Sequence, residues 1–162
     1  ISRVLECISE TLALVAEHDV TLPVMMLADT MGWATPQSVK RVVGAVRERW
    51  PELRVGLHLH DTRGLGIANA LAAIQVGIST LDSSLGGIGG CPAAPGASGN
   101  IVTEDLVFML NSMGYDTGID MDKLLAVRKI VAEALTNETL FGFTPEAGLP
   151  KGHRGRSWGI QT

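Results

Sequence analysis

Residues 54–66 read RVGLHLHDTRGLG, and this stretch decides the fold. Its apolar residues Val55, Leu57 and Leu59 alternate with a second set of positions, Gly56, His58 and His60. A period of two is typical of a β-strand, because successive side chains of a strand point to opposite faces. The pattern therefore predicts a strand with both histidines on one face and the aliphatic side chains on the other. A helix is predicted next, from about Gly66 to Val76, with Gly77 ending it.

The segments on either side predict a regular alternation of helices and strands. Before the central strand we expect a helix over 3–18, a buried strand over 22–28 and a helix over 36–50, with Thr35 as its cap. After it we expect a strand over 78–84, a helix over 103–113 capped by Thr103, and a last helix over 121–140. This order of elements is that of a parallel α/β fold.

A short motif of the form L-x-D-T-x-G recurs where the predicted strands end. It occurs at 27–32 and 59–64, and loosely at 81–86. Polar residues at the C-terminal ends of parallel strands form the active-site rim of a β/α barrel, which needs eight strands and roughly 250 residues. Residues 1–140 are therefore predicted to be the C-terminal portion of a (β/α)8 TIM barrel, with about three strands and their helices. A tail rich in glycine, proline and basic residues is predicted over 141–162.

The composition excludes several classes of protein. The chain has 162 residues, is 46% hydrophobic and 19% charged, and contains 19 glycines, which is typical of a folded core and not of disorder. A net charge of −4 argues against nucleic-acid binding, and no run of 18 apolar residues could span a membrane. Two cysteines favour a reducing compartment, so we expect a cytoplasmic protein. The first residue is Ile1, at the start of a predicted helix. We expect the N-terminal half of the barrel to precede it, and the sequence leaves open whether a targeting segment lies there as well.

Three residues are candidates for binding a metal ion: His58, His60 and Asn100. Two imidazoles at positions i and i+2 of a strand point to the same side, with their Cα atoms roughly 6–7 Å apart, close enough to hold one cation. The amide oxygen of Asn100 suits Mg²⁺ or Mn²⁺ better than Zn²⁺. The alternative is that the histidines only pack or form hydrogen bonds, and that Asn100 only turns the chain. The position of both histidines at a strand end favours the metal site.

Other candidates carry weaker signals. Cys91 follows four glycines in the segment GGIGGCP (86–92), which is typical of a loop that moves, and its thiol could deliver a proton or act as a nucleophile. The alternative for Cys91, and our interpretation of Cys7, is a small buried apolar side chain. Each strand-end carboxylate (Asp29, Asp61 and Asp82) could bind the metal, orient a histidine or cap a helix. Basic residues of the tail could contact phosphates, although a solvated tail is the better interpretation: Lys151, His153, Arg154 and Arg156.

Three segments resemble the 3-hydroxy-3-methylglutaryl-CoA lyase family: GLHLHDT (56–62), LDSSLGGIGGCP (81–92) and GASGNIVTEDL (96–106). The resemblance extends over about residues 22–125. It is specific to the lyases in the glycine-rich loop, whereas the HxHD element is shared with the isopropylmalate and homocitrate synthases. It implies a metal-dependent TIM-barrel lyase of acyl-CoA substrates, with acetyl-CoA and acetoacetate as products, as in leucine degradation. It also leads us to expect a homo-oligomer.

The resemblance also implies roles for individual residues. His58, His60 and Asn100 would bind Mg²⁺ or Mn²⁺, and His58 would also serve as a general acid/base. Cys91 would protonate the departing enolate of acetyl-CoA, and Asp29 would support the metal site.

Two departures from the family pattern bear on this assignment. Ala93 and Pro95 stand where the family commonly has tyrosine and lysine, which affects the acyl-CoA specificity. The family's first-strand aspartate and arginine have no counterpart, so we expect this chain alone to be inactive. The alternatives are a related condensing synthase or aldolase, and a non-catalytic half-barrel.

Overall fold

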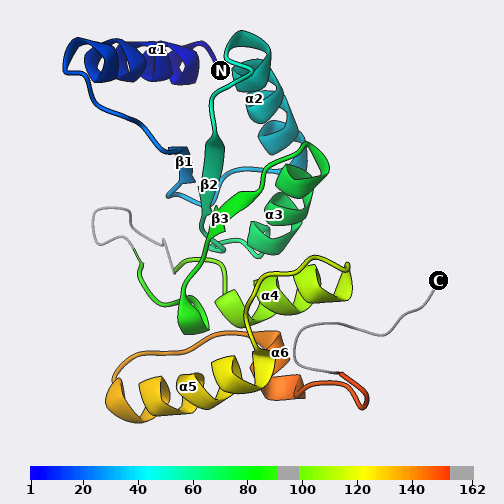
Figure 1. Ribbon diagram of the computed structural model, residues 1–162. Coiled ribbons are helices and arrows are strands. Elements are labelled where there is room, and N and C mark those ends of the chain that lie inside the picture. Colours follow the sequence, from blue (N-terminus) through cyan, green and yellow to red (C-terminus); the bar gives the residue numbers. More distant parts are fainter. Residues whose placement is uncertain (91–98, 154–162) are drawn as a thin grey trace.

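The structure is a computed structural model that describes residues 1–90 and 99–153. It contains a parallel sheet of three strands in the order β1-β2-β3, joined by two helices that lie together on one side of the strands (Figure 1). The elements of this sheet are β1 (Met25–Asp29), α2 (Pro36–Arg49), β2 (Val55–Leu59), α3 (Gly66–Gln75) and β3 (Thr80–Asp82). The predicted parallel α/β arrangement is confirmed.

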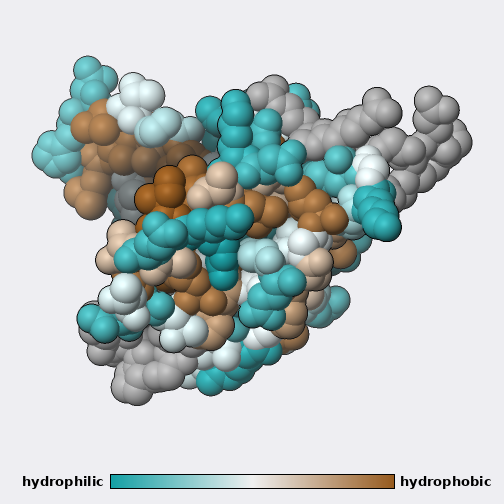
Figure 2. All heavy atoms as spheres, turned by 90° about the horizontal axis from the view of Figure 1, so that it is seen from below, coloured by the Kyte–Doolittle hydropathy of each residue, from teal (hydrophilic) through white to brown (hydrophobic). Residues whose placement is uncertain are grey.

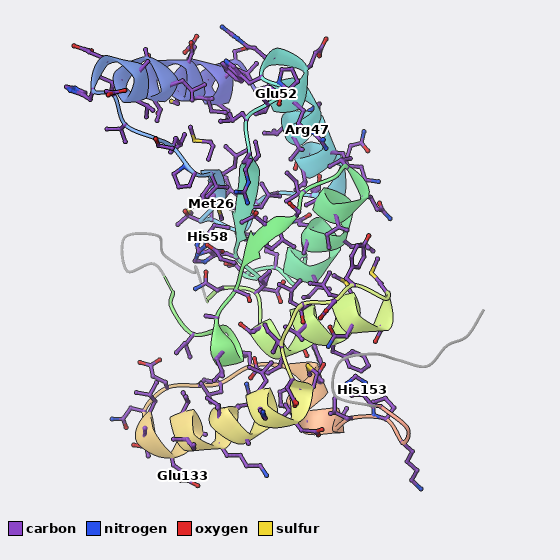
Figure 3. The ribbon with its side chains drawn as sticks, in the orientation of Figure 1. Met26, Arg47, Glu52, His58, Glu133 and His153 are labelled. Carbon is purple, nitrogen blue, oxygen red and sulfur yellow. The ribbon has the colours of Figure 1, made fainter. Side chains whose placement is uncertain are left out.

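The alternating pattern of β2 separates a buried face from a polar face. Leu57 and Leu59 are 4% and 2% exposed and belong to the hydrophobic core. The core also contains the inward side chains of α2 and α3, among them Val39, Val43, Val46, Ala70 and Ala73. Burial of aliphatic side chains provides most of the stabilisation of such a layer. His58 therefore lies on the opposite side of the sheet from α2 and α3 (Figure 3).

The start of α2 agrees with its sequence signals. The hydroxyl of Thr35 accepts a hydrogen bond from the Ser38 backbone, and the Ser38 hydroxyl in turn accepts one from the Thr35 backbone N–H. This reciprocal capping box satisfies N–H groups that have no partner inside the helix. Pro36 fits the first helical position because its ring fixes a helical φ and it has no N–H to satisfy.

The strands are shorter than predicted. β1 begins at Met25 and not at Leu22, which is consistent with Pro23, since proline cannot donate to a sheet. β3 spans only Thr80–Asp82 of the predicted 78–84 segment. The register of the sheet places Ala28, His58 and Asp82 side by side across the three strands.

The remaining helices are α1 (Ser2–Glu17), α4 (Thr103–Ser112), α5 (Met121–Ala134) and α6 (Phe143–Ala147), with a short 3-10 turn η1 (Leu85–Gly87) after β3. α1 confirms the predicted first helix. In Figure 1, α4, α5 and α6 lie below the sheet.

Two details of this C-terminal region were predicted wrongly. Val102 is the N-cap of α4, and the Thr103 hydroxyl lies 2.8 Å from the Ser83 hydroxyl instead of capping. The last predicted helix ends at Ala134, before Thr136 and Asn137, which are weak helix formers. Residues 141–153, the described part of the predicted tail, contain α6.

Gly56 leaves the room that the Met26 side chain occupies on the face that carries the histidines. A Cβ atom at Gly56 would lie 2.3 Å from Met26 Sδ and 3.0 Å from Thr80 Cγ2. Met26 and Thr80 flank Gly56 in the sheet register, so all three line the sheet directly before His58.

We expect Gly56→Ala to lower the stability of the full-length protein by about 1–3 kcal/mol, because overpacking forces neighbouring side chains out of their rotamers. The measurement is urea unfolding. Met26→Ala in the same chain should recover a large part of the loss, since it removes the atoms that clash. A double variant as unstable as Gly56→Ala alone would show that the strain has another origin.

Candidate metal centre

His58 and His60 bring their Nε2 atoms within 3.1 Å of each other at the end of β2. Their rings are 5.0 Å apart between centroids and inclined by 70°. Both side chains leave the strand on the same face because they are two residues apart. The structure therefore places the two predicted histidine ligands together.

The distance between these nitrogens fits two neighbouring ligands of one ion. Bonds of about 2.1 Å at right angles, as in the octahedral coordination of Mg²⁺, put two ligand atoms about 3.0 Å apart. The observed 3.1 Å is close to this separation. Two histidines without an ion can also keep this distance, with one nitrogen donating a hydrogen bond to the other.

The contact with Asp82 determines which ring nitrogen of His58 is available as a metal ligand. Asp82 Oδ1 lies 2.8 Å from His58 Nδ1, and the sheet register places Asp82 directly beside His58. A carboxylate at this position accepts the Nδ1–H and leaves the lone pair on Nε2, where His60 lies. Orientation of a ligating imidazole by a carboxylate is a common feature of metal sites. Of the three roles left open for Asp82, the geometry matches that of orienting a histidine.

His60 is 4% exposed, and burial lowers its pKa below the usual value. The neighbouring His58 lowers the pKa further, whereas the charges of Asp29 and Asp82 act in the opposite direction. A lowered pKa keeps the ring neutral, and neutral imidazole is the form that binds metals. Nδ1 of His60 is buried without a hydrogen-bond partner among the described residues.

Asn100 lies beside His60 through an antiparallel bridge between the two residues. Residues directly opposite each other in such a pair present their side chains on the same face. The Asn100 amide nitrogen donates to the carbonyls of Ile88 and Gly89, at 3.0 and 3.3 Å. The amide oxygen is buried and accepts no hydrogen bond within residues 1–90 and 99–153. A buried amide oxygen without a partner among these residues, on a residue bridged to His60, is a donor type that Mg²⁺ or Mn²⁺ takes.

The other predicted site residues are placed as follows. Both carboxylate oxygens of Asp29 accept backbone N–H groups, from Trp33 and Ala34, each at 2.9 Å. Asp61 accepts the N–H of Gly66 at the start of α3, at 2.6 Å, which is the capping role considered for it. The contacts of Asp29 do not test its predicted role as a support of the metal site, so that role stays a prediction. Cys91 lies outside the described residues.

The candidate centre has no carboxylate or thiolate ligand among the described residues. In residues 1–90 and 99–153, no three His, Cys, Asp or Glu side chains come together in a way that could hold an ion. The candidate centre consists of two imidazoles and one amide, which carry no negative charge, so any ion bound there would need further ligands.

Within residues 1–90 and 99–153, no helix has the length and apolarity to cross a membrane.

The Asp82–His58 contact leads to a prediction for the full-length protein. Asp82→Asn should weaken Mn²⁺ binding by about 10–100-fold, because the amide no longer fixes the Nδ1–H form of His58. Isothermal titration with Mn²⁺ measures the affinity. Asp61→Asn is the matched control, since its carboxylate caps α3, and it should change the affinity less than threefold. Equal losses in both variants would indicate a general charge effect and contradict the orienting role.

Comparison with known proteins places most of this chain in one group. The sequence profile of the HMGL-like family matches residues 6–131. The chain is 47% identical over 113 residues to mitochondrial hydroxymethylglutaryl-CoA lyase of Mus musculus, covering 70% of this chain and 35% of that protein. It is 50% identical over 119 residues to (R)-citramalyl-CoA lyase of Chloroflexus aurantiacus, covering 72% of this chain and 38% of that protein.

A solved structure gives the same result for the fold. The HMG-CoA lyase of Acinetobacter baumannii, in complex with coenzyme A and 3-methylmalate, superposes with a TM-score of 0.76 at 42% identity. The match covers 90% of this chain and 48% of that chain. The chain thus spans between about a third and a half of the length of these relatives. The predicted fold class, a parallel α/β portion of a TIM barrel, is confirmed.

Proposed function

The chain belongs to the HMGL-like family, and we propose on this basis that it is the C-terminal part of a metal-dependent acyl-CoA lyase. The observation that carries the proposal is the meeting of His58 Nε2 and His60 Nε2 at 3.1 Å, with Asn100 bridged to His60 on the same face. The proposed substrate is 3-hydroxy-3-methylglutaryl-CoA, and the products are acetyl-CoA and acetoacetate. The proposed ion is Mg²⁺ or Mn²⁺, held by His58, His60 and Asn100.

A divalent ion bound there would lower the pKa of the substrate's 3-hydroxyl and favour the alkoxide. Cleavage then breaks the bond between C2 and C3. Its electron pair moves to C2 and forms the enolate of acetyl-CoA, while C3 becomes the ketone of acetoacetate. The proposed role of Cys91 is to donate its thiol proton to C2. The proton of the hydroxyl must pass to a base, and the cycle closes when that proton returns to the thiolate.

The geometry bears on the proposed acid/base role of His58. Its Nδ1 is held by Asp82, so Nε2 is the nitrogen available for other work. That nitrogen cannot bind an ion and accept a proton at the same time. We therefore assign His58 primarily to metal binding, and an acid/base role would require Nε2 to leave the ion.

The proposal includes the rest of the barrel. Among the described residues, β1 and β3 each pair on one side only, with β2. Large hydrophobic side chains are also exposed, among them Ile130 at 64% and Phe143 at 84%, and Figure 2 shows hydrophobic patches among hydrophilic ones on the face seen from below. Unpaired strand edges and exposed apolar patches are typical of surfaces that other chain segments or subunits cover. We propose that the N-terminal half of the barrel and a second subunit provide such contacts.

A second substrate has specific support. The relative from Chloroflexus aurantiacus is 50% identical and is a (R)-citramalyl-CoA lyase. Citramalyl-CoA likewise carries a tertiary hydroxyl and would be cleaved at the equivalent carbon–carbon bond. It is therefore the second candidate substrate for the same metal face.

The test is an assay of the full-length protein with both thioesters and with 2-oxoacids plus acetyl-CoA, before and after removal of divalent ions. We expect cleavage of one thioester, loss of activity on metal removal and recovery with Mn²⁺ or Mg²⁺. Residues 1–162 alone are expected to be inactive. Condensation without cleavage would favour a synthase, and no turnover of any substrate by the full-length protein would contradict the proposal.

A further inference from the structure

Glu104 is a fully buried carboxylate that the proposed chemistry does not use. It lies in the first turn of α4, is 0% exposed, and forms an ion pair with Arg128 of α5 at 2.7 Å. The side chain of Arg128 is only 13% exposed. A buried ion pair is a weak source of stability, because removing both charges from water offsets most of their attraction. We therefore explain this pair by the groups that it holds in place.

The ion pair closes a ring of hydrogen bonds around Gly86. The Gly86 N–H donates to both carboxylate oxygens of Glu104, at 3.2 and 3.0 Å, and its carbonyl accepts the N–H of Phe141 at 2.7 Å. Arg128 Nη1 donates to Glu104 Oε1 and, at 2.8 Å, to the Phe141 carbonyl. We call these four residues, Gly86, Glu104, Arg128 and Phe141, the Gly86 clasp. Both backbone polar groups of Gly86 are thereby fixed.

The position that the clasp fixes admits only glycine without strain. Gly86 has a φ of +65°, and a Cβ atom there would lie 2.8 Å from Leu140 Cδ2 and 3.1 Å from Arg128 Nη1. Side chains disfavour this left-handed conformation. The clasp thus holds a left-handed glycine turn between α4, α5 and the segment before α6.

The residues that orient Asn100 come two and three positions after Gly86. Ile88 and Gly89 supply the two carbonyls that accept the Asn100 amide N–H groups, and the Ser84 hydroxyl donates to the Ile88 carbonyl at 2.5 Å. A Cβ atom at Gly99 would lie 2.0 Å from the Gly87 carbonyl oxygen, so the backbones at Gly87 and Gly99 are in close contact. Because the amide nitrogen donates to these carbonyls, the oxygen is the end of the amide that has no hydrogen-bond partner within residues 1–90 and 99–153.

We propose that Glu104 and Arg128 are positioning residues for the metal centre. They fix Gly86, which places the carbonyls of Ile88 and Gly89, and these carbonyls in turn orient the Asn100 amide with its oxygen available as a ligand. This inference rests on the proposed function, since it concerns the same Asn100. Neither Glu104 nor Arg128 forms a hydrogen bond with His58 or His60, so both act through the backbone of residues 86–89.

The test uses Mn²⁺ titration of the full-length protein below the unfolding temperature of every variant. Arg128→Met should raise the dissociation constant for Mn²⁺ by about 10-fold or more, the usual cost of losing an outer support of a metal ligand. Arg128→Lys keeps a donor and the charge, and it should stay within about threefold of the wild type. If Arg128→Met does not fold, the pair Glu104→Gln with Arg128→Met replaces it, because this pair removes both buried charges.

Val46→Ala is the matched control for lost stability. Val46 is fully buried in α2, and its truncation should lower the melting temperature without changing the Mn²⁺ affinity more than twofold. A folded Arg128→Met protein that binds Mn²⁺ as the wild type does would overturn the positioning role alone. A wild-type protein that binds no Mn²⁺ would overturn the proposed function and this inference together.

Discussion

Replacing His60 by alanine in the full-length protein should abolish most of its metal binding and turnover. We expect the dissociation constant for Mn²⁺ to rise by about 100-fold or more and kcat to fall by about 1,000-fold. The second effect follows because a bound catalytic ion typically contributes several kcal/mol of transition-state stabilisation. The reason is geometric: His60 Nε2 is half of the nitrogen pair at 3.1 Å, and His58 alone would keep only one of the two proposed imidazole ligands. Isothermal titration and an acetyl-CoA release assay measure the two effects.

The control for this variant is His18→Ala. His18 is an exposed residue at the end of α1, and its loss should leave both quantities within twofold. His60→Gln is the second variant, since it fills more of the buried space left by the ring. Full activity of either His60 variant would show that the histidine pair only packs or forms a hydrogen bond, which is the alternative considered from the sequence.

Cys91→Ala should separate proton transfer from metal binding. We expect kcat to fall by about 100- to 10,000-fold, the usual contribution of a positioned general acid, while the Mn²⁺ affinity stays within twofold. The reason is chemical, because the enolate of acetyl-CoA needs a proton at C2 and the resemblance assigns the thiol to this step. Steady-state assay with the better thioester substrate provides the measurement.

Cys7→Ala is the matched control, since Cys7 is a free thiol on α1 and should be dispensable. The interpretation of Cys7 as a buried apolar side chain was wrong, because the structure places it on the exposed side of α1. Normal turnover by Cys91→Ala would remove the thiol from the mechanism but leave the metal centre untouched. A loss of Mn²⁺ affinity in Cys91→Ala would instead mean that the loop supports the metal site.

The fold and the histidine pair could be predicted because they follow from local periodicity. The alternation in β2 directs His58 and His60 to one face whatever surrounds them. The same pattern assigns Leu57 and Leu59 to the core, where the structure places them. Capping of α2 by Thr35 and Ser38 is equally local and was also predictable in part.

Features that depend on contacts between distant segments could not be derived in this way. The pairing of Asp82 with His58 requires the register of β2 against β3, and β3 is only three residues long. Its position directly after Leu81 was the available signal, since it puts Asp82 on the polar face of its strand. The Gly86 clasp joins residues 86, 104, 128 and 141, and no sequence pattern relates four positions spaced so unevenly.

The central claim is that His58, His60 and Asn100 bind one divalent ion. The most direct measurement is a crystal structure of the full-length protein grown with Mn²⁺, in which anomalous scattering locates the metal. We predict a single peak about 2.0–2.3 Å from His58 Nε2, His60 Nε2 and Asn100 Oδ1. A peak bound elsewhere, with the two imidazoles still hydrogen-bonded to each other as in the present structure, would contradict the account.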